Sequence, residues 1–98
     1  MNGKNTIKTL GDYWRESTYY AEAEKTTWIW WWPNGAFLPY FERMDKRITC
    51  ELACGHGRHL PNYRALCDDV ILVDVNRENI NVCKARFAGD NGIRYIVN

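Results

Sequence analysis

The second half of the chain alternates short apolar runs with amphipathic stretches. The runs at residues 48–52, 70–73 and 93–97 are rich in Ile, Leu and Val and predict three strands. The uninterrupted run 70–73 is typical of a strand buried on both faces, and hence of a parallel sheet. Residues 77–87 predict a helix with a core face made of Ile80, Cys83 and Phe87. The order strand, helix, strand, helix, strand predicts an α/β fold with right-handed crossovers.

The first predicted strand runs into a glycine turn that opens a helix. Ile48, Cys50 and Leu52 supply its apolar side chains and predict that it is buried. Gly55 and Gly57 allow a tight turn and a close approach of the backbone to a ligand, with a helix starting near Gly57. Such junctions direct the N–H groups of a helix N-terminus at the polar end of a ligand.

Two acids lie near the carboxyl ends of predicted strands. Glu51 falls inside the first strand, where a buried carboxylate needs a positive or hydrogen-bonding partner, so a ligand with a donor or a positive charge is favoured. Asp74 follows the run 70–73, at the sheet edge where ligands of doubly wound folds bind. There it is either an acceptor for both hydroxyls of a ribose, or a solvated strand-end carboxylate or helix cap. Asn76 can cap the next helix.

The first half of the chain predicts a helical lead-in. Residues 12–25 have an amphipathic pattern, and residues 36–46 predict a short helix before the first strand. Four aromatic side chains of the first segment either pack on the domain or close over a ligand: Tyr13, Trp14, Tyr19 and Tyr20. In the second segment, Phe37, Leu38, Phe41 and Met44 recur at helical spacing, and Phe37, Phe41 and Met44 are expected to belong to the core.

Between these helices lies an unusual aromatic cluster, with four tryptophans in Trp28–Trp32. Pro33 and the turn signal Asn34-Gly35 end it. The rings either cover the sheet edge and the first helix or form an exposed surface for a substrate or partner. Base stacking is less favoured, because no basic residues are interleaved with the rings.

Composition limits the function classes. A chain of 98 residues forms one small domain, and 46% hydrophobic with 26% charged residues is typical of a soluble globular protein. The formal net charge of +1 gives no signal for nucleic acid or an anionic membrane. No apolar run approaches the roughly 20 residues of a membrane span. The N-terminus lacks the apolar core of a signal peptide.

Cysteine and histidine usage suggests neither disulfides nor a metal. Disulfide-framework spacing is absent, so the thiols are expected to be reduced and the compartment cytoplasmic. The candidate metal ligands match no zinc spacing: Cys50, Cys54, His56 and His59. Cys50 is also expected to point to the side of the sheet opposite Glu51. His56, inside the glycine loop, is either a general base or a filler of the loop.

The segment Glu51-Leu-Ala-Cys-Gly55-His-Gly57-Arg resembles the first motif of class I S-adenosylmethionine-dependent methyltransferases, whose pattern is an acid, three residues, Gly, any residue and Gly. The segment Val70-Ile-Leu-Val-Asp74-Val-Asn76 is similar to the second strand of that family, which ends in an acid. The resemblance implies a Rossmann-like parallel sheet, of which residues 47–98 are the first three strands. It also implies that residues 1–46 are an N-terminal helical lead-in, and that the chain stops before the fourth strand.

The resemblance further implies S-adenosylmethionine as cofactor and assigns roles to seven residues. Asp74 would bind the ribose and Val75 would flank the adenine. Glu51 would accept hydrogen bonds around the amino acid end of the cofactor. The other cofactor contacts would come from the glycine turn and the lead-in: Ala53, Gly55, Gly57 and Tyr20. No metal and no dedicated catalytic base are required, because methyl transfer depends on proximity and in-line alignment.

Alternatives stay open at this stage. A nicotinamide-binding oxidoreductase fragment also has a strand, glycine turn and distal acid, but its third glycine is replaced by Leu60. A non-catalytic cofactor-binding or protein-interaction module fits the tryptophan cluster. The methyl acceptor is not indicated, since family residues that contact it follow the fourth strand. The open edge of the first strand predicts either a homo-oligomer that pairs with or covers this edge, or a marginally folded chain with exposed apolar surface.

Overall fold

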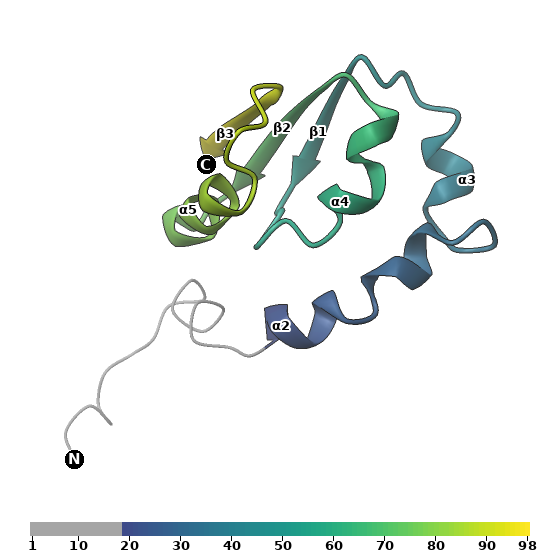
Figure 1. Cartoon of the computed structure of the whole chain (residues 1–98), viewed down its shortest axis with the longest axis horizontal. Coiled ribbons are helices and arrows are strands. Elements are labelled where there is room, and N and C mark those ends of the chain that lie inside the picture. The colour runs from purple at the N-terminus through teal and green to yellow at the C-terminus, as the bar shows by residue number, and fades with distance from the viewer. Residues whose placement is uncertain (1–18) are drawn as a thin grey trace.

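The computed structural model describes residues 19–98 (Figure 1). Tyr13 and Trp14 lie outside the described residues. The elements are α2 (Tyr19–Glu24), the 3-10 helix η2 (Thr27–Trp31), α3 (Leu38–Phe41), β1 (Ile48–Leu52), α4 (Leu60–Tyr63), the 3-10 helix η3 (Arg64–Leu66), β2 (Asp69–Asp74), α5 (Arg77–Arg86) and β3 (Ile93–Val97). None of the helices in this part of the chain has the length and apolar character needed to cross a bilayer.

The predicted parallel sheet is confirmed. The three strands lie in the order β1-β2-β3, and both neighbouring pairs are parallel. In register, Thr49 faces Val70 and Val70 faces Ile93. Each parallel connection contains a helix, α4 with η3 in the first crossover and α5 in the second. The architecture is α/β and Rossmann-like, with the carboxyl ends of all three strands at one edge of the sheet (Figure 1).

One face of the sheet carries the hydrophobic core. Side chains from the strands, from α4 and α5 and from the lead-in form one buried cluster: Phe41, Cys54, Leu60, Tyr63, Cys67, Val70, Leu72, Ile80, Cys83 and Ile93. Phe87 packs against this cluster, so the predicted core face of α5 is confirmed. Asn76 accepts a hydrogen bond from the Glu78 N–H at 2.9 Å and caps α5 as expected.

No element within residues 19–98 covers the opposite face of the sheet, which corrects the prediction of strands buried on both sides. Ile48 and Leu52 are 60% and 74% exposed, and Cys50 is exposed as well. In β2, Val70 and Leu72 are buried whereas Ile71 and Val73 are only half-buried. Because side chains alternate along a strand, β1 turns its polar residues Thr49 and Glu51 to the covered face.

Two predicted helices are shorter than expected. The helix after the glycine turn begins at Leu60 and not near Gly57, because Gly57 has a left-handed backbone with φ of +78°. The lead-in helix α3 has only four residues. Met44 therefore lies beyond any helix face and is 49% exposed, and Phe37 is 39% exposed, so their assignment to the core was wrong. That of Phe41, 6% exposed, is confirmed.

The described part of the lead-in, residues 19–46, lies along the same side of the molecule as α4 and α5 (Figure 1). Of the tryptophans, Trp31 packs against the core, with ring centroids 5.3 Å from Phe41 and 5.4 Å from Tyr63. Its neighbours Trp28, Trp30 and Trp32 are exposed. The cluster thus combines one inward anchor with an outward aromatic surface.

The buried hydroxyl of Thr49 generates a stability prediction. Its Oγ1 has no hydrogen-bond partner among the described residues, and an unsatisfied buried polar group is unfavourable by about 1–3 kcal/mol. Thr49→Val is therefore expected to raise the free energy of unfolding by about 1 kcal/mol in urea titrations. The matched control is Thr27→Val, which removes a buried hydroxyl that donates to the Ala23 carbonyl at 2.8 Å. That variant is expected to lose stability, and losses in both would contradict the prediction.

Candidate ligand-binding site

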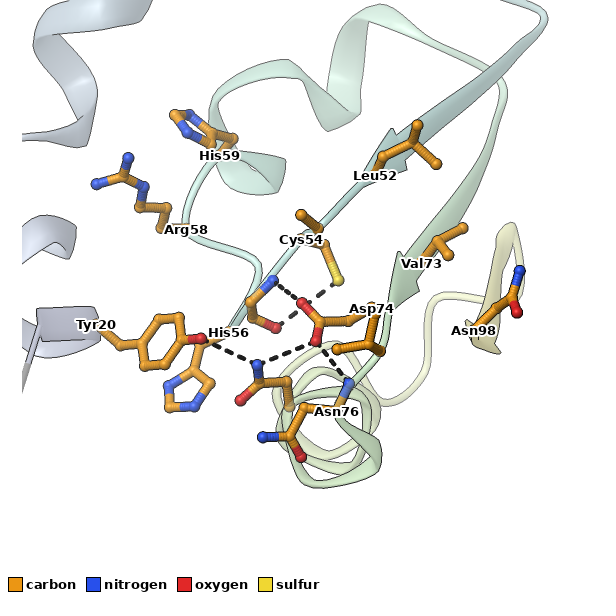
Figure 2. Close-up of a pocket in the computed structure, with 14 residues that line it drawn as sticks. Tyr20, Leu52, Cys54, His56, Arg58, His59, Val73, Asp74, Asn76 and Asn98 are labelled. Carbon is orange, nitrogen blue, oxygen red and sulfur yellow. Dashed lines mark hydrogen bonds between the residues drawn. The ribbon is translucent and has the colours of Figure 1, made fainter. Parts of the chain in front are cut away.

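A cavity of about 700 Å³ lies at the carboxyl ends of β1 and β2 (Figure 2). This volume falls within the range of small-molecule sites, roughly 300–1,000 Å³. Its lining comes from α2, the glycine turn, the end of β2, the start of α5 and the residue after β3: Tyr20, Leu52, Ala53, Cys54, Gly55, His56, Arg58, His59, Val73, Asp74, Val75, Asn76, Asn79 and Asn98. Its position is that of ligand sites in doubly wound sheets.

The buried carboxylate of Asp74 connects the segments around this cavity. It accepts hydrogen bonds from the backbone N–H of Gly55 at 2.8 Å and of Asn76 at 2.8 Å. The side-chain amide of Asn79 donates to it at 3.2 Å. A carboxylate offers about four acceptor positions, so roughly one is left for a ligand hydroxyl.

Tyr20 closes one side of the cavity over the glycine turn. A Cβ at Gly55 would lie 2.6 Å from Tyr20 Cε1, so only glycine allows this approach of ring and backbone. The Tyr20 ring stacks on His56, with centroids 4.1 Å apart, and its hydroxyl accepts from the Asn79 amide at 3.0 Å (Figure 2). Burial lowers the pKa of His56, which favours a neutral imidazole beside the cavity.

A second, smaller pocket of about 310 Å³ adjoins the first and shares Leu52, Ala53 and His59 with it. Its other lining residues are Trp31, Phe37, Cys50, Glu51 and Tyr63. The Tyr63 hydroxyl donates to Glu51 Oε1 at 2.6 Å. Burial raises the pKa of Glu51, with this hydrogen bond and the charge of Arg58 acting in the opposite direction.

The seven predicted site residues are not all brought together. Four line only the larger cavity: Tyr20, Gly55, Asp74 and Val75. Ala53 lines both pockets, and Glu51 lines only the smaller one. Gly57 lines neither, because it is buried against α5, where a Cβ would lie 2.6 Å from the Phe87 ring.

Several lining residues were not selected from the sequence. Asn79 bridges Asp74 and Tyr20, and a signal for it existed in its position on the first turn of the helix that follows Asp74. His59, whose Nδ1 accepts from Trp31 Nε1 at 3.1 Å, was considered only as a metal ligand. Within residues 19–98, no three His, Cys, Asp or Glu side chains are grouped so that they could hold a metal.

Sequence comparisons find no relative, since no family model and no curated protein matches the chain. Solved structures do match. A chain in the complex between the Haloferax volcanii Trm112 methyltransferase activator and a protein described as a methyltransferase matches 95% of this chain, with TM-score 0.65 and 16% identity. CalS10, an amino pentose methyltransferase from Micromonospora echinaspora with bound S-adenosylmethionine, matches 96%, with TM-score 0.51 and 15% identity.

These similarities show the fold, which is that of class I methyltransferases. The predicted fold class is therefore confirmed. The chain spans 40% and 36% of the length of the two matched chains.

Ala53 generates a second stability prediction, because it has φ of +55° at the end of β1. A left-handed conformation is unfavourable by roughly 1–2 kcal/mol for a residue with a Cβ, and glycine avoids this. Ala53→Gly is expected to raise the free energy of unfolding by about 1 kcal/mol. The control Ala85→Gly, in the exposed part of α5, is expected to lower it by about 0.5–1 kcal/mol. If Ala53→Gly and Ala85→Gly lower the free energy of unfolding equally in thermal and urea unfolding, residue 53 is not left-handed in solution.

His59 generates a prediction about pH. Burial lowers its pKa, the charge of Arg58 acts in the same direction, and Glu24 opposes them. Only a neutral ring can accept the Trp31 N–H, so the folded state disfavours the protonated ring. Because the folded pKa lies below the unfolded value of about 6.5, the contribution is complete above that pH and is lost as the pH falls.

The melting temperature of the protein is therefore expected to fall between about pH 7.5 and pH 5.5, as more histidine is protonated in the unfolded state. His59→Asn is expected to flatten this dependence. A smaller slope with the same sign should persist from His56, whose pKa burial also lowers. An unchanged slope in His59→Asn would contradict the assignment.

Proposed function

We propose that the chain is the cofactor-binding part of an S-adenosylmethionine-dependent methyltransferase, with the cofactor in the larger cavity. The observation that carries this proposal is the hydrogen bond from the Gly55 N–H to the Asp74 carboxylate. It lies at the carboxyl edge of a sheet with the class I methyltransferase fold. CalS10, which has this fold, was solved with S-adenosylmethionine bound.

The lining residues suit the parts of this cofactor. The acceptor position that Asp74 retains takes one ribose hydroxyl, and Val75, 76% exposed at the cavity, provides an apolar surface for the adenine. Gly55 lets the ligand approach the backbone, while Tyr20 and Ala53 form walls on either side of the turn. Gly57 supports the turn by its packing against α5. Glu51 lines the adjoining smaller pocket and not this cavity.

The cofactor supplies an activated methyl group on a sulfonium, which an acceptor nucleophile attacks directly. The contribution of this chain is to bind and orient the cofactor and to exclude water from one side of it. The free thiols of Cys50, Cys54, Cys67 and Cys83 support the proposal of a cytoplasmic protein.

A protein-interaction role is the second candidate, supported by the exposed rings of Trp28, Trp30 and Trp32. The matched Haloferax volcanii chain comes from a complex with an activator protein. A related proposal is that a second copy of the chain covers β1, whose side chains Ile48 and Leu52 are exposed.

Calorimetry tests the cofactor assignment. S-adenosylhomocysteine and S-adenosylmethionine are expected to bind more tightly than NAD. Asp74→Asn is expected to weaken S-adenosylhomocysteine binding by about 1.5–3 kcal/mol, the contribution of one hydrogen bond to a charged group. The matched control is Asp68→Asn, an exposed position at the opposite end of β2. Tighter binding of NAD would refute the proposal.

Because Asp74 also holds the glycine turn, its variant needs a second comparison. Adenosine and 2′,3′-dideoxyadenosine separate ribose recognition from structural damage. If Asp74 binds a hydroxyl, Asp74→Asn lowers the affinity for adenosine and leaves that for the dideoxy compound nearly unchanged. Equal losses for both nucleosides would assign Asp74 a purely structural role.

A further inference from the structure

The side chain of Arg86, in the last turn of α5, joins the lead-in to the glycine turn. Its Nη1 donates to Glu24 Oε1 at 2.9 Å and its Nη2 to Glu24 Oε2 at 2.8 Å, so the ion pair has two parallel hydrogen bonds. Nη1 also donates to the backbone carbonyl of His56 at 3.0 Å. One cation therefore holds α2 and the glycine turn at the same time.

A second contact holds α2 near its other end. Tyr20 and Glu24 have the spacing i, i+4 and share one face of α2. The Tyr20 ring stacks on His56, and its hydroxyl accepts from the side chain of Asn79 (Figure 2). Asn79 and Arg86 have the spacing i, i+7, so they also share one face of α5. The two helices thus meet through an aromatic contact at one end and an ionic contact at the other.

Apolar burial contributes little to the docking of α2. Among its described side chains, Ala23 is buried, whereas residues 21 and 22 are exposed. An element with few buried apolar groups opens locally at a small free energy. The C-terminal end of α2 leads into η2, which Trp31 anchors in the core. The contacts of Tyr20 and Glu24 therefore account for much of the docking of α2 on α5.

These contacts also reach the glycine turn, against which two rings pack. A Cβ at Gly55 would lie 2.6 Å from the Tyr20 ring, and one at Gly57 would lie 2.6 Å from the Phe87 ring. The Arg86 guanidinium lies over the same Phe87 ring, with its carbon 5.2 Å from the centroid. Breaking the ion pair therefore loosens the cover on Gly55 and also the group that holds the turn from α5.

We propose that α2 is a cover that opens and closes over the larger cavity, and that Arg86 is the positioning residue that couples its closure to the glycine turn. In the closed state, which the structure shows, the Glu24–Arg86 pair is formed and Tyr20 lies on Gly55. In the open state the pair is broken, and the cavity loses the wall that Tyr20 provides. This movement belongs to the cavity whatever its ligand, so it does not depend on the proposed function.

Amide hydrogen exchange measures the opening, because the hydrogen-bonded N–H of Gly55 belongs to the residue that Tyr20 covers. Glu24→Gln keeps the shape of the side chain and removes its charge. It is expected to raise the exchange rate of Gly55 about two- to fivefold, the range for a partly exposed ion pair. The matched control Glu22→Gln breaks a pair with Lys25 inside the lead-in and is expected to leave the rate unchanged. An unchanged rate in Glu24→Gln would overturn the proposal.

The amide of Val70 is the internal reference for global unfolding. It donates to the Gly92 carbonyl at 2.9 Å and lies in the central strand β2. Its exchange rate is expected to be the same in the wild-type protein and in Glu24→Gln. A rise at Val70 equal to the rise at Gly55 would mean that the variant destabilises the whole domain, and would overturn the assignment of a local opening.

The amide of Gly57 tests the coupling to the turn. It donates to the Cys54 carbonyl at 2.9 Å, inside the turn. If Arg86 couples the cover to the turn, Glu24→Gln raises the exchange of Gly57 by a factor similar to that at Gly55. A rise at Gly55 alone would overturn the coupling.

Salt tests the ionic character of the contact. Raising sodium chloride from about 0.05 to about 0.5 M screens exposed charges. It is expected to raise the exchange rate of Gly55 in the wild-type protein more than in Glu24→Gln, which has already lost the pair. Equal salt effects in the two proteins would overturn the role of the ion pair.

A ligand tests the cover itself. S-adenosylhomocysteine, the ligand used to test the proposed function, is expected to slow the exchange of Gly55 and to dissociate about two- to fivefold faster from Glu24→Gln. Binding without any slowing at Gly55 would overturn the assignment of α2 as a cover. If S-adenosylhomocysteine does not bind, the proposed function fails, and the exchange rates of the free protein still decide whether α2 opens.

Discussion

The hydrogen bonds of Asp74 are the constraint on which the site depends. One carboxylate joins the turn after β1, the turn after β2 and the first turn of α5, through Gly55, Asn76 and Asn79. Two parallel strands are thereby held so that their carboxyl ends open on one cavity. Asp74 maintains the site and also lies at its surface, so under the proposed function the same carboxylate would serve both structure and ligand recognition.

Periodicity predicted the strands well because each is bounded by strong local signals, such as the glycine turn after Leu52 and Asp74 with its capping neighbour Asn76. Burial was less predictable. An apolar run tells nothing about which face a helix will cover, and β1 turns Thr49 inward while Leu52 is exposed. The separation of Glu51 from Asp74 into two pockets depends on tertiary placement of Tyr63 and Trp31, to which no motif points.

The two faces of the sheet carry different kinds of side chain. The covered face holds the core and directs Glu51 toward Tyr63, while the bare face presents Ile48, Cys50 and Leu52 to the surroundings. The glycine turn follows β1 at the edge of the sheet, between the two faces. Beneath it, Cys83 Sγ lies 3.3 Å from the Gly55 carbonyl, so α5 supports the turn from the core side.

Contacts between α2 and α5, beside the larger cavity, join segments that are far apart in the sequence. Tyr20 meets Asn79 across 59 residues, and Glu24 pairs with Arg86 across 62 residues, with oxygen–nitrogen distances of 2.8 and 2.9 Å in the latter. Contacts of such long range form late, because loop closure must be compensated by many interactions at once. A ligand of the larger cavity that contacts Tyr20 would therefore also stabilise the docking of α2 on α5, because binding to the folded state adds to its stability.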